Sequence, residues 1–181
     1  RQRQMCIRDR TPLWQLSAVE QAAGVKNRTF TATELVHSAL GRIEQKNAQL
    51  NAIVDLLNES ALTAAQEADA AVADGKALGP LHGVPVTVKV NVDTKGRATT
   101  NGMGVFKDTI APDHSPVVSN LLKAGAILIG RTNTPEMSMR LTTDNPLHGL
   151  TRNPSDLQAT PGGSSRGAAS AGAAGFAAIN H

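Results

Sequence analysis

The stretch Gly83-Val84-Pro85-Val86-Thr87-Val88-Lys89-Val90-Asn91-Val92 decides the fold of this 181-residue chain. Valine stands at every second position, which is typical of a β-strand, because successive side chains of a strand point to opposite faces of its sheet. The valines predict one buried face, and Lys89 falls on the other. A sheet covered on both faces would bury Lys89 as well, but the pattern alone leaves an exposed strand lysine equally open.

The segments that follow predict an α/β fold with a mixed, largely parallel sheet flanked by helices. Ser115-Pro116 combines a cap serine with a first-turn proline, so a helix should begin there and end near Gly125. A buried strand is expected directly afterwards, over 126–132. A strand, a crossover helix and a second strand form the connection that joins parallel neighbours in a sheet.

Further elements are expected on both sides of this unit. Thr31-Ala32-Thr33-Glu34 is a capping box that should open a helix to about Lys46. Asn58 is expected to cap an alanine-rich helix that ends at Gly75. The remaining predicted elements are a helix over 13–25, a strand over 51–57, a helix over 165–175 and a strand over 176–179.

The net charge of +3 comes from the first ten residues, which hold four arginines and one aspartate. The rest of the chain carries 14 basic and 14 acidic residues, so no nucleic-acid surface is expected. No apolar run approaches the length of a membrane span, and no membrane partner is expected. The single cysteine, Cys6, excludes a disulfide framework and fits a reducing, cytoplasmic compartment.

The segment Thr160-Pro161-Gly162-Gly163-Ser164-Ser165-Arg166-Gly167 places two serines in a glycine-rich turn. Such a composition alone is common in flexible linkers and tight turns. Pro161 and the apolar, alanine-rich residues 168–179 argue against a linker. A phosphate-binding loop needs Gly-x-x-x-x-Gly-Lys-[Ser/Thr], and no lysine follows here. Together with Lys89, the serines supply two members of a Ser-Ser-Lys hydrolase site.

From Thr31 onward the chain resembles the amidase signature family. The blocks that carry the resemblance follow the family's order and spacing; they are residues 33–36, 78–89, 124–136, 142–149, 152–154 and 160–167. The resemblance implies hydrolysis of a small-molecule amide through an acyl-serine intermediate, without metal or cofactor. It also implies that the full-length protein could form a homodimer.

The resemblance assigns roles to individual residues. In the family a serine nucleophile is assisted by a neutral lysine, which corresponds to Lys89, and by a serine that follows a cis peptide, which corresponds to Ser164. A lysine can act as the base only if burial lowers its pKa from about 10.4. Ser165 is expected to shape the loop. The substrate-binding residues that the resemblance implies are Thr142, Thr143, Asp144, Gly162, Gly163 and Ser165.

The family's nucleophile belongs to a Gly-x-Asp-x-Gly-Gly-Ser block that, in this numbering, would begin after His181. Residues 11–181 are therefore expected to be the N-terminal part of a single amidase signature domain, inactive by itself. Residues 1–10 are expected to be a non-native or disordered leader. Two substitutions depart from the family pattern. Val90 replaces a common aspartate, and Arg166 replaces a common glycine and is expected to face substrate, a partner domain or solvent.

Other functions stay open. One is the A-type subunit of a glutamyl-tRNA amidotransferase, although Thr134-Pro135-Glu136 looks more like the hydrolase branch; the other is an inactive, truncated binding module. Asp144 and Glu136 could pair for acid–base work, but Asp144 is expected to bond its own backbone in a turn. The histidines whose spacing matches no metal site, and which we expect to be satisfied or exposed, are His82, His114 and His148.

Overall fold

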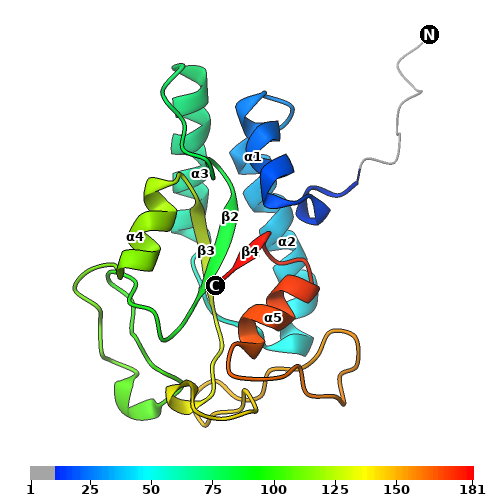
Figure 1. Ribbon diagram of the computed structural model, residues 1–181, viewed down its shortest axis with the longest axis vertical. Helices are drawn as coiled ribbons and strands as arrows, with labels where there is room; N and C mark the ends of the chain where they lie inside the picture. Colours follow the sequence, from blue (N-terminus) through cyan, green and yellow to red (C-terminus); the bar gives the residue numbers. More distant parts are fainter. Residues whose placement is uncertain (1–10) are drawn as a thin grey trace.

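The computed structural model describes residues 11–181, which form a four-stranded mixed sheet packed between helices (Figure 1). The strand order is β1-β3-β2-β4. β2 (Pro85–Lys89) runs parallel to both β3 (Ile127–Thr132) and β4 (Ile179–Asn180), whereas β1 (Ile53–Leu56) is antiparallel to β3. The predicted α/β class and largely parallel sheet are confirmed. Residues 1–10, with the predicted leader and Cys6, lie outside the described residues.

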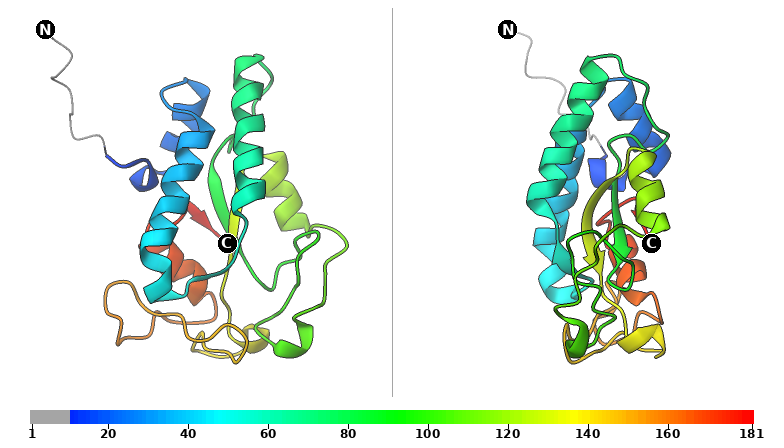
Figure 2. Two further views of the ribbon diagram at one scale, coloured as in Figure 1. Left: turned by 180° about the vertical axis from the view of Figure 1, so that it is seen from behind. Right: turned by 90° about the vertical axis from the view of Figure 1, so that its left-hand side faces the viewer.

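All five residues of β2 are buried, Lys89 included, so the alternative of an exposed strand lysine is wrong. Helices α2 (Ala32–Leu50) and α3 (Asn58–Ala73) lie on one side of the sheet and α4 (Pro116–Lys123) on the other (Figure 2). Val86 of β2 and Val84 just before it pack with Leu121 of α4 in one apolar cluster. Ile127 and Ile129 of β3 pack with α2 and α3 in a second, larger cluster.

The N-terminal helices begin where side chains cap them. The helix predicted over 13–25 is in fact a 3-10 turn, Leu13–Gln15, followed by α1 (Ala18–Lys26). A capping box between Ser17 and Glu20 makes Ser17 the start of α1, so the earlier residues form a separate turn. The predicted capping box of α2 is confirmed: the Thr31 hydroxyl accepts from the Glu34 amide at 3.0 Å. That helix runs past Lys46 to Leu50.

Helix α3 corrects one predicted cap. Asn58 is the first helical residue, and Leu57 occupies the cap position without a side-chain hydrogen bond. The reason is that the Leu57 amide still donates to the Ile129 carbonyl of β3, so the helix begins directly where strand pairing ends. The predicted stop at Gly75 agrees with its φ of 67°.

The crossover from β2 to β3 is confirmed. Ser115 accepts from the Val118 amide at 3.3 Å and Pro116 begins α4, as predicted. Two short 3-10 turns, Gly104–Phe106 and Glu136–Ser138, lie in the loops that follow β2 and β3. No helix of residues 11–181 is long and apolar enough to cross a membrane.

The last helix, α5 (Arg166–Ala173), matches the prediction, but the strand after it is shorter and later than predicted. Only Ile179 and Asn180 pair with β2. Phe176, at the start of the predicted strand, is instead fully buried in the larger apolar cluster. Because its aromatic ring fills the core, the backbone joins the sheet only three residues later.

Candidate active site

Lys89 and the paired serines meet at the end of β2, although 75 residues separate Lys89 from Ser164 in the sequence. The Lys89 amino nitrogen Nζ lies 3.5 Å from Ser164 Oγ and 3.3 Å from Ser165 Oγ. The Lys89 side chain is only 6% exposed. Burial lowers its pKa from the ordinary lysine value, because a charged amine loses its hydration there. The two groups expected from the sequence are therefore within reach of one another.

The glycine-rich loop lets the serines approach Lys89. Gly162 has a φ of 92°, and the peptide bond between Gly163 and Ser164 is cis, as the resemblance implies. A Cβ atom on Gly163 would lie 2.6 Å from the Leu141 carbonyl oxygen, so the loop packs directly on the backbone of residue 141. Glycine is needed at Gly163 because any side chain would push these two segments apart.

Arg166 does not reach solvent, and that part of its prediction is wrong. The side chain is buried, and its Nη1 donates to the Thr160 hydroxyl at the start of the same loop. An alanine at Gly162 would approach the Arg166 Nε at 3.7 Å, which shows how closely the guanidinium lies under the turn. Arg166 therefore stabilises the loop of residues 160–165, called the serine loop below, by a hydrogen bond on its buried side.

Thr142, Thr143 and Asp144 lie in the loop that begins at Leu141, beside Gly163. Thr142 and Asp144 are exposed, whereas Thr143 is buried and its carbonyl accepts from the Thr151 amide. The turn predicted for Asp144 is made by the next residue: Asn145 Oδ1 accepts from the amides of Leu147 and His148. An asparagine before a proline is an equally good turn residue, and burial of its amide decides between the two.

Two buried asparagines, Asn133 and Asn145, hold this loop against the end of β3, a role that the sequence did not predict for either. Asn133 Oδ1 accepts from Asn145 Nδ2 at 2.9 Å, and Asn133 Nδ2 donates to Gly149 and Thr151. Gly167 of α5 packs on the Asn133 backbone. Asn133 thus links helix α5, which follows the serine loop, to the loop of Thr142, Thr143 and Asp144. In the sequence, the feature that could have indicated this role is its position directly after a buried strand.

Two residues after Lys89, Asn91 belongs to a second cluster of hydrogen-bonded polar side chains. Asn91 Nδ2 donates to Ser138 Oγ at 3.1 Å, and Ser138 Oγ lies 2.9 Å from Thr134 Oγ1. Met137 and Ser138 both adopt positive φ angles, 52° and 60°. No sequence pattern predicts such angles for these residue types. The hydrogen bonds that join Asn91, Ser138 and Thr134 are therefore seen only in the structure.

The three histidines and the Glu136 carboxylate make hydrogen bonds or ion pairs with other groups. His82 Nε2 is 2.9 Å from the Ala68 carbonyl, His114 Nδ1 accepts from the Lys95 amide, and His148 Nε2 is 3.1 Å from Thr100 Oγ1. Burial lowers the pKa of His148. Glu136 pairs with Arg140 at 2.9 Å rather than with Asp144. Among residues 11–181, no group of three His, Cys, Asp or Glu side chains could hold a metal ion.

This arrangement suits proton transfer between an amine and a hydroxyl. A buried lysine is neutral more readily than an exposed one, and a neutral amine can take a proton from the hydroxyl of a neighbouring serine. The serine can in turn accept a proton from a third group. Serine hydrolases need such a base because a serine hydroxyl alone is a weak nucleophile.

The family model described as Amidase matches residues 34–181. An indoleacetamide hydrolase of Bradyrhizobium diazoefficiens is 55% identical over 94% of this chain and 32% of its own length. The A-type subunit of a glutamyl-tRNA(Gln) amidotransferase from Natranaerobius thermophilus is 38% identical over 87% of this chain and 32% of its own length.

A solved structure of a fatty acid amide hydrolase is also similar. It superposes with a TM-score of 0.89 at 31% identity, over 93% of this chain and 30% of that protein. The chain thus spans about a third of the length of the relatives it matches. The family model covers most of the chain, the resemblance recognised in the sequence is confirmed, and the chain belongs to the amidase family.

Proposed function

We propose that this chain supplies the lysine base and the relaying serine of an amide hydrolase that works through an acyl-serine intermediate. Lys89 takes a proton from Ser164, and Ser164 takes one from the nucleophilic serine as that serine attacks the amide carbonyl. The leaving amine then receives a proton by the same route in reverse, and water hydrolyses the acyl-enzyme. The observation that supports this most is the buried Lys89 amine 3.5 Å from Ser164 Oγ.

The nucleophile and the oxyanion-binding amides are not among the 181 residues in this proposal. In the family they belong to the Gly-x-Asp-x-Gly-Gly-Ser block that would follow His181. The loop of Thr142, Thr143 and Asp144, with Gly162, Gly163 and Ser165, would contact the substrate. The packing of Gly163 on Leu141 supports this, because it brings the two segments to the same place. Cytoplasmic location and homodimer formation belong to the same proposal.

Indoleacetamide is the first substrate to test, because the relative with 55% identity carries that name. The A-type amidotransferase relative, which is 38% identical, keeps a second function open, as part of an enzyme that acts on glutamyl-tRNA(Gln). The difference in identity favours the hydrolase. The two functions share the lysine and serines and differ in the amide donor and in the need for a second protein chain.

The test begins with the coding sequence beyond His181. If it encodes the glycine-rich nucleophile block, we expect the extended protein to release ammonia from indoleacetamide. Lys89→Met and Ser164→Ala should each lower kcat by about a hundredfold or more, since each removes a group that handles the proton. Ser155→Ala, on an exposed loop, is the matched control and should leave kcat unchanged.

Other outcomes would revise the proposal. Ammonia release that survives Lys89→Met would exclude Lys89 as the base. Activity that appears only when charged tRNA and a second protein chain are present would assign the chain to the amidotransferase. The 181-residue chain alone should form no covalent adduct with a fluorophosphonate, because the nucleophile is absent from it; an adduct on Ser164 or Ser165 would contradict that assignment.

A further inference from the structure

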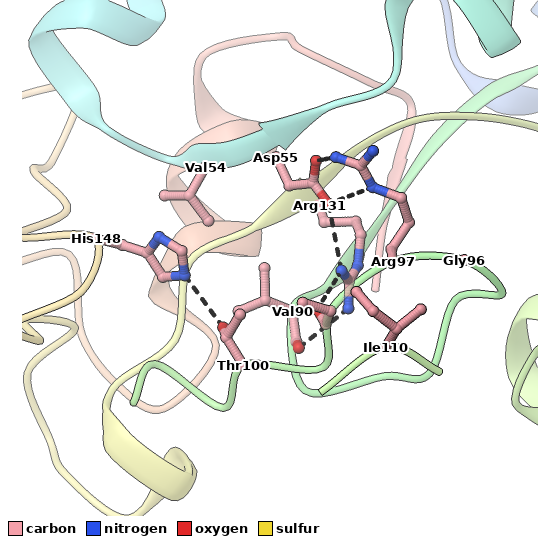
Figure 3. Close-up of a pocket in the computed structure, with 10 residues that line it drawn as sticks. Val54, Asp55, Val90, Gly96, Arg97, Thr100, Ile110, Arg131 and His148 are labelled. Carbon is pink, nitrogen blue, oxygen red and sulfur yellow. Dashed lines mark hydrogen bonds and ion pairs between the residues drawn. The ribbon is translucent and has the colours of Figure 1, made fainter. Parts of the chain in front are cut away.

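Arg131 lies beside the Lys89 strand but on the other face of the sheet. It stands in register with Val88 across the parallel pair of β2 and β3, whereas Lys89 pairs with Thr132. In-register neighbours point to the same face, so Arg131 points with Val88 and away from Lys89. Its side chain is 1% exposed and lines a cavity of about 290 Å³ (Figure 3). No step of the proposed proton transfer uses this buried guanidinium.

The Arg131 guanidinium binds the backbone that directly follows Lys89. Nη2 donates to the carbonyl oxygens of Val90 and Val92, both at 3.1 Å. Nη1 donates to the Ala98 carbonyl at 2.7 Å, so the same side chain also holds the returning part of the loop. Three carbonyls of residues 90–98 therefore converge on one side chain from β3.

Asp55 of β1 fixes the guanidinium from the other side. Its Oδ2 accepts from Arg131 Nη1 at 3.3 Å, and the same carboxylate binds Arg97, as Figure 3 shows. Asp55 pairs with Arg131 in the antiparallel register of β1 and β3. A buried cation with a carboxylate and three carbonyl partners has its hydrogen-bonding geometry fixed by several elements at once.

These contacts restrain the backbone at the end of β2, next to Lys89. The Val90 amide donates to the Thr132 carbonyl, and the Val92 amide donates back to the Lys89 carbonyl in a tight turn. The carbonyls of Val90 and Val92 lie beyond the last residue of β2 and join no strand ladder; besides Arg131, Val92 accepts from the Thr94 hydroxyl at 3.4 Å. With Arg131 in place, the backbone on the C-terminal side of Lys89 is held by the sheet on one side and by a guanidinium on the other.

We propose that Arg131 is a positioning residue for Lys89: by binding the carbonyls of Val90 and Val92 it keeps the lysine amine buried against Ser164 and Ser165. Arg131 does not touch the reacting atoms. The inference rests on the proposed function only in giving Lys89 the role of base; the restraint itself is a property of this chain.

Lysine cannot replace arginine in this role. The guanidinium is a planar fork with five N–H donors, and here it spans acceptors from strand β1 and from the loop that follows β2. A lysine would keep the positive charge but would present one nitrogen at the end of a flexible chain. Arg131→Lys therefore keeps the positive charge at residue 131 but removes the forked arrangement of hydrogen-bond donors, so it tests that arrangement alone.

The experiment titrates the Lys89 amine by NMR in the 181-residue chain and measures amide hydrogen exchange. In Arg131→Lys we expect a higher Lys89 pKa than in the unsubstituted chain, because a looser strand end admits water to the amine. We also expect at least about tenfold faster exchange at the Val90 and Val92 amides, with the α2 amides unchanged. Arg97→Lys is the matched control: Arg97 binds the same Asp55 but is 43% exposed and should change neither quantity.

The Lys89 pKa and the amide exchange rates together test whether Arg131 positions Lys89. An unchanged Lys89 pKa and unchanged exchange in a folded Arg131→Lys protein would overturn it. If that variant does not fold, exchange in the unsubstituted chain decides: Val92 should be protected nearly as well as the α2 core, and rapid local exchange there would overturn the inference. A lysine pKa near its ordinary value in the unsubstituted chain would contradict the proposed function instead, while the exchange data would still test the restraint.

Discussion

The Lys89 amino group is buried, and burial raises the free energy of its charged form. Burial lowers its pKa in the folded state below the value of about 10.4 expected for the unfolded chain. Between these two pKa values the unfolded chain holds a proton that the folded chain does not, so the free energy of unfolding rises with pH in that window. Below the folded-state pKa both states are charged, and the full cost of burying the ammonium group opposes folding.

Lys89→Met should therefore stabilise the protein at neutral pH. Methionine keeps an unbranched apolar side chain and removes the charge, so we expect a higher free energy of unfolding at pH 7 than in the unsubstituted chain. The gain should shrink as pH rises toward about 10.4, where the lysine is neutral in both states. Urea unfolding at a series of pH values measures this, with the exposed Lys46→Met as control. A stability difference that stays constant with pH would contradict the prediction.

At the scale of elements, helices α2 and α3 are joined by a carboxylate. Asp69 of α3 accepts from the amides of Ala32 and Thr33, at 2.6 and 3.1 Å, and from the Thr33 hydroxyl. The first amides of a helix have no partner within it, so Asp69 completes the capping that Thr31 and Glu34 begin. The capping box is local in sequence, but this second cap comes from the next helix and depends on packing.

Asp69→Asn should weaken this joint. The amide keeps only one acceptor oxygen and turns an NH₂ group toward donors, so we expect a loss of about 1–2 kcal/mol in the free energy of unfolding. Chemical denaturation monitored by circular dichroism measures it. Asp74→Asn, which removes an exposed ion pair with Lys76 near the end of the same helix, should cost less than about 0.5 kcal/mol. Equal losses in the two variants would show that Asp69 is not a cap.

Helix α5 docks through a glycine. A Cβ atom on Gly167 would lie 2.3 Å from the Asn133 carbonyl oxygen and 2.5 Å from its nitrogen, so the first turn of α5 rests on the end of β3. This contact sets where the serine loop enters the helix.

Gly167→Ala should move that turn and cost about 1–3 kcal/mol of stability, because backbone atoms cannot yield as a flexible side chain would. The Lys89 amine should lose its contacts with the two serine hydroxyls, which its NMR titration would report as a changed pKa. Gly172→Ala on the exposed side of the same helix is the control and should be neutral or stabilising by up to about 1 kcal/mol. A fully stable Gly167→Ala would contradict this docking.

At the scale of the whole molecule, the first and last described segments pack together. Trp14 lies against Gly175, where an added Cβ would approach its ring at 2.3 Å, and the Arg42 guanidinium lies 4.2 Å from the ring centroid. Arg42 also donates to the Ala174 carbonyl. One aromatic ring thus joins the N-terminal turn, helix α2 and the end of α5.

Trp14 is the single tryptophan, so its fluorescence reports this junction alone. If residues 11–181 unfold as one cooperative unit, the fluorescence and far-ultraviolet circular dichroism transitions should coincide in urea. Arg42→Met, which keeps bulk and removes the cation, should shift both midpoints together. A fluorescence transition that precedes the loss of helix would show that the junction opens separately.

The elements that were predicted well are those whose signals are local. The valine alternation around Lys89, the capping box at Thr31 and the cap at Ser115 each act within a few residues, so they identify a strand and two helix starts without knowledge of the fold. The boundaries that were wrong depend on distant partners. Asn58 is not a cap because Leu57 pairs with Ile129, and the last strand begins late because Phe176 is buried in the core.

The sequence by itself determined the α/β class, the strand that carries Lys89, the glycine-rich serine loop and the family to which both belong, because these are written in short patterns and ordered blocks. Only the tertiary structure decided how deeply Lys89 is buried, that Ser165 lies as close to it as Ser164, and that Asn133, Arg166 and Arg131 hold the surrounding segments. Burial and hydrogen-bond partners come from residues far apart in the chain, and no local pattern records them.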